Sequence, residues 1–181
     1  HREVTVTPEE FKVLVNHFQD QEFRDLLTVT FETGCRPQES LRVEARHVDL
    51  ANQRWVFPKS EAKNKKRSRI VYMTDKAQEI VTRLVHRYPT GKLFRNIDGV
   101  PWTPSATNCR FQRARKTLKK KYSLYALRHA WATNALLQGV DPLTVAILMG
   151  HQDPSMLSKV YQHLSLNPQH MLSQAKKAVT T

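Results

Sequence analysis

Apolar residues recur every three to four positions along most of the chain, a pattern typical of amphipathic helices. The segment 7–10 (Thr-Pro-Glu-Glu) has an N-cap, a proline at the first helical position and a glutamate three residues after the cap, and predicts a helix through about Phe18. Glycines 34, 139 and 150 follow apolar-periodic segments and are expected to end helices. Further helices are predicted over 23–31, from Pro37, over 75–85, 103–117, 123–137 and 142–149, from Asp153 through Tyr161, and from Pro168 to Val179.

Two short runs in the middle of the chain, Arg54–Phe57 and Arg69–Tyr72, are rich in β-branched and aromatic residues, and both predict strands. The polar and strongly basic segment 59–68 between them is expected to be a turn or a mobile loop. Lys92–Phe94 predicts a short third strand. The expected fold class is therefore mainly α with a small antiparallel β-sheet (α+β).

The length and uniform composition of the chain predict a single domain. Its 181 residues contain no internal repeat, no low-complexity linker and no break in composition, so we expect one domain over residues 1–181. No apolar run approaches the ~18 residues that a transmembrane helix needs, and the first residues lack the apolar core of a secretory signal. Because the chain does not begin with Met, we expect it to be part of a longer protein.

The chain is strongly basic, with 29 Lys and Arg residues against 16 Asp and Glu residues, a formal charge of +13 and an isoelectric point near 10.0. Such a charge favours a polyanionic partner, and nucleic acid is the simplest one. Two basic clusters, 59–69 and 110–121, contain a single acidic residue, Glu61. A solvated surface is the alternative interpretation, but like charges repel in a compact fold, and we favour phosphate contacts, which salt would weaken. The residues expected to make them are Lys65, Lys66, Arg67, Arg110, Arg113 and Lys116.

Several classes of chemistry are excluded by what the chain lacks. Five glycines in total leave no Gly-rich phosphate loop, so an NTP-binding P-loop is excluded. The eight histidines show no spacing typical of metal ligands and no carboxylate cluster suggests a two-metal nuclease, so the sequence predicts neither a metal nor another cofactor. The two cysteines, Cys35 and Cys109, make a poor disulfide framework, and we expect both to be reduced.

Two arginines occupy positions where a surface charge is not expected. Arg36 lies at a helix–helix junction, and Arg128 lies inside an apolar helix one position before His129. A guanidinium on a buried side needs an anion, so each is either half of a structural ion pair or part of a phosphate site. His151 directly follows a predicted helix end, and Tyr161, ten residues on, is by itself more typical of a core or interface position.

Four segments, taken in order, resemble the motifs of the tyrosine recombinases, also called the phage integrase family. Residues 33–41 (TGCRPQESL) resemble the first arginine box, and residues 127–133 (LRHAWAT) resemble the second. Residues 148–151 (LMGH) and 160–163 (VYQH) resemble the motif that ends in the nucleophilic tyrosine. The resemblance spans roughly residues 7–164 and implies the catalytic-domain fold of that family.

The resemblance implies a transesterification on DNA that needs neither metal nor ATP. Tyr161 would attack the scissile phosphate and form a 3′-phosphotyrosyl link, with Arg36 and Arg128 holding the negative charge that develops. The basic turn lies where the family keeps its catalytic lysine. Counting back from the following strand favours Lys63, with Lys65 as the alternative, as the group that protonates the leaving 5′ oxygen. Because the bond energy is kept in the intermediate, strands would be exchanged rather than hydrolysed.

Four further residues take roles from the same resemblance. His151 would hydrogen-bond the phosphate or accept the tyrosine proton, while His129 would brace the site and Glu39 would orient its surroundings. Tyr125 stands three residues before the second arginine, where the family usually has a histidine and sometimes a lysine. A tyrosine can hydrogen-bond a phosphate oxygen, but with an ordinary pKa near ~10 it is a poor acid–base group at neutral pH.

The resemblance also implies partners and a larger assembly. We expect an N-terminal DNA-clamping domain upstream, double-stranded DNA as the partner, a monomer in the free state and a homo-tetramer on paired DNA sites. The enzyme would act on the chromosome in the cytoplasm, in a bacterium or for a phage, and not at a membrane. Residues 1–164 would form the catalytic core with the nucleophile, and the helix in 165–181 would either dock on a neighbouring protomer or pack on its own domain. The expected function is an integrase or site-specific recombinase; the alternatives are a DNA-binding relative that no longer cuts and a type IB topoisomerase.

Overall fold

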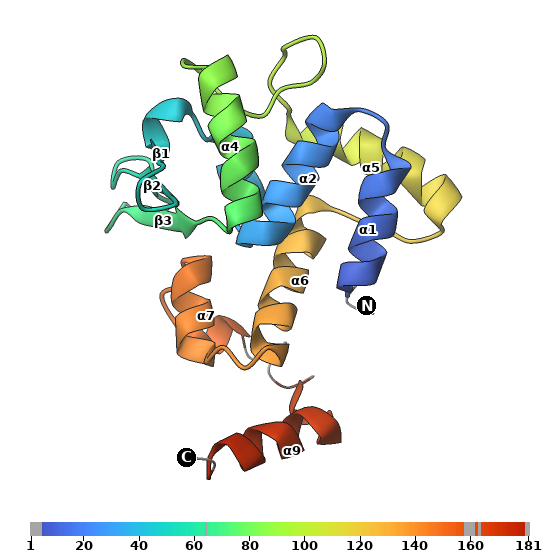
Figure 1. The fold of residues 1–181 in the computed structure, drawn as a ribbon, viewed down its shortest axis with the longest axis vertical. Coiled ribbons are helices and arrows are strands. Elements are labelled where there is room, and N and C mark those ends of the chain that lie inside the picture. Colours follow the sequence, from blue (N-terminus) through green and yellow to red (C-terminus); the bar gives the residue numbers. More distant parts are fainter. Residues whose placement is uncertain (1–4, 64, 158–161, 163, 180–181) are drawn as a thin grey trace. The chain divides into compact units, whose positions relative to one another are not determined.

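The computed structural model describes residues 5–63, 65–157, 162 and 164–179. Its helices are α1 (Pro8–His17), α2 (Gln21–Thr33), α3 (Pro37–Arg42), α4 (Asp75–Arg87), α5 (Pro104–Leu118), α6 (Leu124–Leu137), α7 (Pro142–Met149) and α9 (Pro168–Lys177), as drawn in Figure 1. The strands are β1 (Val48–Asp49), β2 (Arg54–Phe57) and β3 (Arg69–Tyr72), and the short 3-10 helices are η1 (Ala45–His47) and η2 (Pro154–Leu157). The chain divides into two compact units, His1–Trp131 and Ala132–Thr181. That residues 1–181 form a single domain stays a prediction.

The described elements confirm the expected fold class, mainly α with a small antiparallel sheet. The strands lie in the order β1-β2-β3, and β2 pairs with β3 in the register Arg54↔Tyr72 and Phe57↔Arg69. In β2, Trp55 and Phe57 are both fully buried, as the period-2 alternation of a strand requires. This face of the sheet therefore contributes to the core of the first unit.

The third strand is not the one predicted. Lys92–Phe94 forms an isolated bridge, between Lys92 and Glu44, and the third strand is instead β1, which has two residues and pairs with β2. Leu93 and Phe94 are adjacent in the chain and both are buried, whereas neighbouring side chains in a strand point to opposite faces. Burial of both side chains in the core thus overrides the strand tendency of this segment.

The helix ends follow from local chemistry, as the sequence predicts. The Thr7 hydroxyl accepts a hydrogen bond from the Glu10 N–H at 3.2 Å, and the Glu10 carboxylate accepts one from the Thr7 N–H at 2.9 Å, so α1 begins with a capping box. α2 ends at Gly34 with φ 64°, and α7 ends at Gly150 with φ 73°. Glycine adopts this left-handed conformation without strain, and the residue after each glycine begins a segment with a new direction.

The predicted helix from Asp153 through Tyr161 is described only at its start. Pro154–Leu157 forms the 3-10 helix η2, and the carboxylate of Asp153 accepts the Ser155 N–H at 2.8 Å. Tyr161 lies outside the described residues. That a helix carries it stays a prediction.

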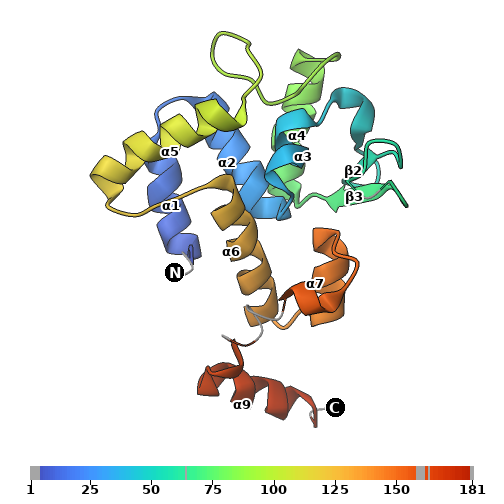
Figure 2. The same ribbon diagram turned by 180° about the vertical axis from the view of Figure 1, so that it is seen from behind.

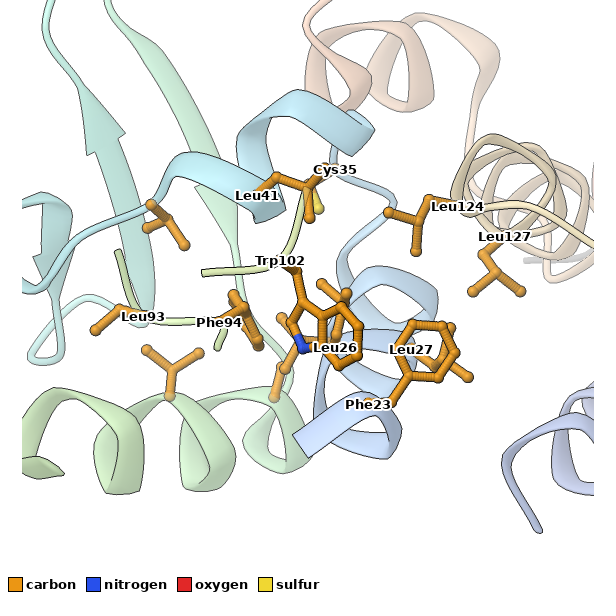
Figure 3. Packing of buried hydrophobic residues seen from close by; sticks show 14 of the residues in the cluster. Phe23, Leu26, Leu27, Cys35, Leu41, Leu93, Phe94, Trp102, Leu124 and Leu127 are labelled. Carbon is orange, nitrogen blue, oxygen red and sulfur yellow. The ribbon is translucent and has the colours of Figure 1, made fainter. Parts of the chain in front are cut away.

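The core of His1–Trp131 forms around α2, which packs against α1, α3 and α4 (Figures 1 and 2). Phe23, Leu26 and Leu27 of α2 are fully buried, and burial of each such side chain contributes about 1.5–3 kcal/mol. Trp102, from the segment before α5, packs on Phe23 with 5.0 Å between the ring centroids (Figure 3). This packing fixes α2, at whose C-terminal end the segment that resembles the first arginine box begins.

The unit Ala132–Thr181 contains the C-terminal end of α6 together with α7, η2 and α9. α7 buries Val145, Ala146 and Met149 and exposes Leu143 and Ile147. The helix predicted at the C-terminal end is present as α9, and none of its residues is buried. Among the described residues, no helix combines the length and the apolar character needed to cross a membrane.

Candidate active site

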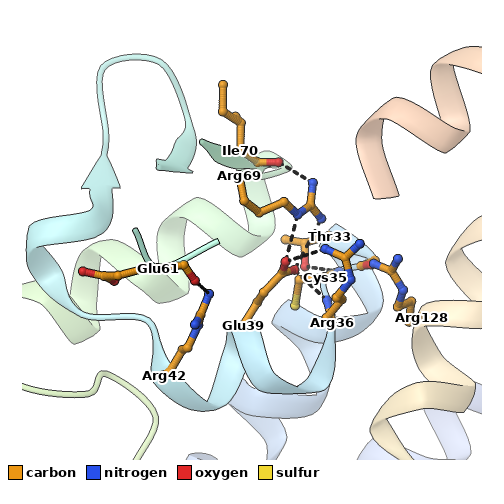
Figure 4. Close-up of polar contacts among 10 residues, drawn as sticks. Thr33, Cys35, Arg36, Glu39, Arg42, Glu61, Arg69, Ile70 and Arg128 are labelled. Atoms are coloured by element: carbon orange, nitrogen blue, oxygen red, sulfur yellow. Dashed lines mark hydrogen bonds and ion pairs between the residues drawn. The ribbon is translucent and has the colours of Figure 1, made fainter. Parts of the chain in front are cut away.

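The two arginine boxes meet in the unit His1–Trp131 (Figure 4). Arg36 is the N-cap residue of α3 and follows the reversal at Gly34 and the buried Cys35. Arg128 lies on α6 and is only 4% exposed. Its Nη1 donates a hydrogen bond to the Gly34 carbonyl oxygen at 2.7 Å, across a separation of 94 residues in the sequence. Segments that are far apart in the chain therefore form one cluster.

The Glu39 carboxylate is the centre of this cluster. Arg36 donates to it twice, from its backbone N–H at 2.8 Å and from Nη1 at 3.0 Å. Arg69, the first residue of β3, donates from Nε at 2.8 Å and from Nη2 at 3.3 Å. Glu39 is 3% exposed, and a buried carboxylate needs such donors to stay charged. Glu39 thus joins the first arginine box to the sheet.

The burial and charge of the cluster change two acid–base equilibria. Burial alone would raise the pKa of the Glu39 carboxyl, but the positive charges and hydrogen bonds of Arg69 and Arg36 bring it below its ordinary value. Burial and the neighbouring charge of Arg36 lower the pKa of Arg128 to about 10, although Glu39 opposes the change. Both groups remain ionised at neutral pH.

The four residues of the cluster carry a net positive charge. Arg36 and Arg69 bind the single carboxylate of Glu39, and the third guanidinium, from Arg128, is close enough for the charges of Arg36 and Glu39 to shift its pKa. The side chain of Arg36 is the most accessible of the three, at 20% exposed, while Arg69 is 8% exposed. Positive charge in excess of its carboxylate partner and next to solvent is what a phosphate site requires, because guanidinium forks match phosphate oxygens.

The predicted lysine turn connects β2 to β3 in the same unit. Lys63 and Lys65 are both exposed, and Ala62, directly before Lys63, is 4% exposed. The Lys65 N–H donates to the Ala62 carbonyl at 3.0 Å, and Lys65 has a positive φ of 51°. The choice between the two lysines stays a prediction.

Two further predicted residues flank Arg128 on α6. Tyr125 precedes it by three residues, which places the two on neighbouring positions of one helix face, and its side chain is 67% exposed. His129 follows Arg128 directly and is half-buried. The roles of Tyr125 and His129 stay predictions.

Two predicted catalytic residues, His151 and Tyr161, belong to the other unit of the chain, Ala132–Thr181. His151 follows Gly150 in the unit Ala132–Thr181, where its backbone N–H donates to the Ala146 carbonyl at 2.9 Å and closes the end of α7. Its side chain is half-buried. Tyr161 lies outside the described residues.

The predicted phosphate-contacting residues differ in their surroundings. Arg110 forms an ion pair with Asp20, with one N–H···O distance of 3.1 Å, and its guanidinium lies over the Phe23 ring at 4.7 Å. This guanidinium is therefore already engaged within the protein, and its contact with DNA stays a prediction. The others are exposed: Lys65, Lys66, Arg67, Arg113 and Lys116.

Arg69 is a site residue that the sequence pattern did not single out. It belongs to the basic cluster 59–69, yet it is buried and bound to Glu39. A signal was present, because strand alternation places residue 69 on the same face as Val71, which is 1% exposed. An arginine in phase with an apolar strand position indicates a buried partner of opposite charge.

Comparison with known proteins agrees with this architecture. Residues 5–167, most of the chain, match the family model described as the phage integrase family. The chain belongs to the phage integrase family. The two motif arginines that the sequence predicts for this family, Arg36 and Arg128, lie in the one cluster that forms around Gly34 and Glu39.

Relatives within the family share the sequence at a moderate level. The tyrosine recombinase XerD of Staphylococcus aureus is 27% identical over 163 residues, which cover 83% of this chain and 52% of the relative. The XerD of Staphylococcus saprophyticus is 28% identical over 161 residues, with the same coverage. The chain thus spans about half the length of these relatives.

Solved structures share the fold. The XerA recombinase has a TM-score of 0.77 at 20% identity, covering 100% of this chain and 67% of its own. The integrase of the transposon Tn1549, solved in complex with circular intermediate DNA, has a TM-score of 0.79 at 18% identity and covers 99% of this chain and 68% of its own. These similarities place the chain in the fold of the recombinase catalytic domain.

Proposed function

We propose that this chain is the catalytic part of a site-specific DNA recombinase or integrase. The observation that carries the proposal is the cluster of Arg36, Arg69 and Arg128 around Glu39, which holds three positive charges against one negative charge in a mostly buried setting. Membership of the phage integrase family and the recombinase relatives support the same conclusion.

The proposed reaction exchanges one phosphate ester for another. The Tyr161 hydroxyl attacks the scissile phosphorus, the P–O5′ bond breaks, and a 3′-phosphotyrosyl link and a free 5′-hydroxyl result. Arg36 and Arg128 donate hydrogen bonds to the non-bridging oxygens, where negative charge develops. Lys63 gives a proton to the leaving 5′ oxygen, and His151 assists at the phosphate or accepts the tyrosine proton. The arginines supply the charge stabilisation, and no nucleotide is hydrolysed, so the proposed reaction needs neither metal nor ATP.

The proposed partner is double-stranded DNA. The exposed basic residues of the β2–β3 turn and of α5 can contact the DNA backbone, and the Tn1549 integrase was solved with its DNA. The proposed assembly is a monomer in the free state and a homo-tetramer on paired sites, with the C-terminal helix docking on a neighbouring protomer. The exposed apolar residues of α9, Met171 and Leu172, support such docking.

One observation favours a second candidate, a DNA-binding member of the family that does not cut. Tyr125 occupies the position three residues before Arg128 and is exposed. A neutral phenol can donate a hydrogen bond to the phosphate, but it does not bring the positive charge of an imidazolium. Arg36, Arg128, His151 and Tyr161 are all present, however, and this favours the cutting enzyme.

A covalent-adduct assay tests the proposed function. The full-length protein is incubated with nicked duplexes that contain the ends of the mobile DNA element on which it would act. A denaturing gel then separates free DNA from protein-linked DNA. We expect an adduct with the wild type and none with Tyr161→Phe, while Tyr72→Phe, a matched change of an exposed tyrosine on β3, keeps it. An adduct that persists in Tyr161→Phe would place the nucleophile elsewhere. Tight binding without an adduct would favour the non-cutting candidate.

A further inference from the structure

The turn that carries the candidate lysine is anchored by one acidic residue. Glu61 is the single acid in the basic segment 59–69. Its carboxylate binds Arg46 Nη1 at 2.7 Å and His47 Nε2 at 2.7 Å, and its backbone carbonyl accepts from Arg42 Nη2 at 2.7 Å. Three residues from α3 and η1 therefore hold one residue of the turn.

The ring of His47, which donates to the Glu61 carboxylate, is itself held in one orientation. The ring is buried, and its Nδ1 accepts the backbone N–H of Glu44 at 3.0 Å, so Nε2 carries the ring's hydrogen and donates it to Glu61. The ring also packs on Phe57 of β2, with 4.7 Å between the centroids. A ring held on one side by the backbone and on another by the sheet leaves the carboxylate little freedom.

The anchor reaches the residue before the candidate lysine. The N–H groups of Glu61 and Ala62 both donate to the Pro58 carbonyl, at 2.9 and 3.1 Å, and the Ala62 side chain is buried. Lys63 comes next and is exposed. The turn also carries Lys65, Lys66 and Arg67, and their mutual repulsion would favour a spread of conformations without a fixed base.

We propose that Glu61 is a positioning residue for Lys63: its ion pair with Arg46 and the hydrogen bond that it accepts from His47 fix the base of the β2–β3 turn and so hold the Lys63 ammonium near the leaving oxygen. This inference rests on the proposed function. When the P–O5′ bond breaks, the electron pair stays on O5′ and the proton passes to it from Lys63 Nζ. A lysine held near that oxygen transfers the proton faster than one on a freely moving turn. Lys63 follows the anchored Ala62 directly in the chain, and this favours Lys63 over Lys65, although the Lys65 N–H also donates to the Ala62 carbonyl at 3.0 Å.

The experiment compares two leaving groups in the full-length protein. One nicked duplex has the ordinary phosphodiester, and the other has a bridging sulfur at the 5′ position, whose thiolate leaves without needing a proton. We expect Glu61→Ala to slow cleavage of the oxygen substrate by roughly 10- to 100-fold and to leave cleavage of the sulfur substrate near the wild-type rate. Lys63→Ala is expected to show the same pattern, and the double variant to be no slower than Lys63→Ala alone.

Matched variants separate positioning from a general loss of structure. Glu44→Ala removes the other carboxylate that pairs with Arg46, at 2.8 Å, and should leave both rates unchanged because Glu44 is not part of the turn. Glu61→Gln keeps the side-chain size and can still accept hydrogen bonds, so it should slow the oxygen substrate less than Glu61→Ala does. The ratio of the two rates is measured within each variant, so a partly unfolded preparation does not change it.

Three outcomes would overturn the inference. If Glu61→Ala slows cleavage of both substrates equally, Glu61 has a structural role. If it slows cleavage of neither substrate, Glu61 does not position Lys63. Sulfur rescue of Lys65→Ala instead of Lys63→Ala would show that another lysine is the proton donor. If the wild type forms no adduct at all, the proposed function itself fails, and that result is distinct from the other three patterns.

Discussion

Arg128 and Gly34 are joined by a 2.7 Å hydrogen bond from the guanidinium Nη1 to the glycine carbonyl, across 94 residues of sequence. The glycine serves three purposes at one position. Its φ of 64° reverses the chain after α2, its missing side chain admits the ring of Trp131, and its carbonyl holds Arg128. The first arginine box therefore helps to position the arginine of the second.

Replacing this glycine should disrupt the site and lower the stability. A Cβ at position 34 would lie 2.5 Å from Cδ2 of Trp131, and the left-handed φ adds backbone strain. Gly99 has a φ of 76°, but a Cβ at that position would meet nothing within 4 Å, so Gly99→Ala is the matched control. We expect Gly34→Ala to lower the free energy of unfolding by about 1–3 kcal/mol more than Gly99→Ala does, measured by urea denaturation. Equal losses would mean that Trp131 moves aside without cost.

Loss of Arg69 should destabilise the protein through Glu39. Arg69→Ala removes two of the guanidinium donors to the buried carboxylate and leaves Arg36 to pair with it, and breaking a buried pair from one side costs about 3 kcal/mol. Arg54→Ala, which breaks a partly exposed ion pair with Asp49 on the neighbouring strand, should cost much less. Denaturant unfolding of both variants checks this. A similar loss in the two would indicate that Glu39 finds a replacement donor.

The stability of the protein should depend on pH through Glu39. Its pKa in the folded protein lies below the ordinary value of 4.5, so its contribution is fully present above pH 4.5 and is lost as the pH falls through the lower folded value. Glu39→Gln should therefore be less stable than the wild type at neutral pH, and the difference should shrink in acid. The free energy of unfolding of both proteins, measured from about pH 7 to about pH 3, checks this. Parallel curves would contradict it.

The two cysteines should react at very different rates. Cys35 is fully buried, and burial together with the charge of Glu39 raises the pKa of its thiol to about 11, while Cys109 is exposed. Because the thiolate is the reactive form, a thiol reagent such as DTNB should modify Cys109 alone in the native protein and both thiols after unfolding. Cys109→Ser should then show no rapid reaction. Rapid modification of that variant would mean that the α2–α3 junction opens readily.

Local signals in the sequence predicted most of the described elements. The capping box at Thr7 and Glu10, the glycines that end α2 and α7, and the two strands β2 and β3 all depend on residues close in the chain. The error in the strand prediction comes from packing between residues that are distant in the chain. The sequence predicts the third strand at Lys92–Phe94, but the core takes up both Leu93 and Phe94, and the two-residue β1 pairs instead.

The candidate site was predictable in part. Arg36, Glu39 and Arg128 can be selected from the sequence because their motifs are contiguous, and the structure brings these three together. Arg69 lies outside these motifs. Strand alternation indicates that its side chain is buried, but its partner Glu39 lies 30 residues away, so the sequence does not identify the pair. The anchor at Glu61 escapes prediction for the same reason, since its partners come from a different pair of elements.

The sequence by itself determined the family, the helix ends, the strands β2 and β3, and the residues of the arginine boxes, because each depends on the order and chemistry of neighbouring residues. The tertiary structure decided which charges meet. Glu39 is surrounded by Arg36 and Arg69, Arg128 is held by Gly34, and Glu61 is held by residues before the sheet. Such pairings depend on which side chains the packed core brings within about 3 Å, and this distance has no counterpart in the spacing of residues along the chain.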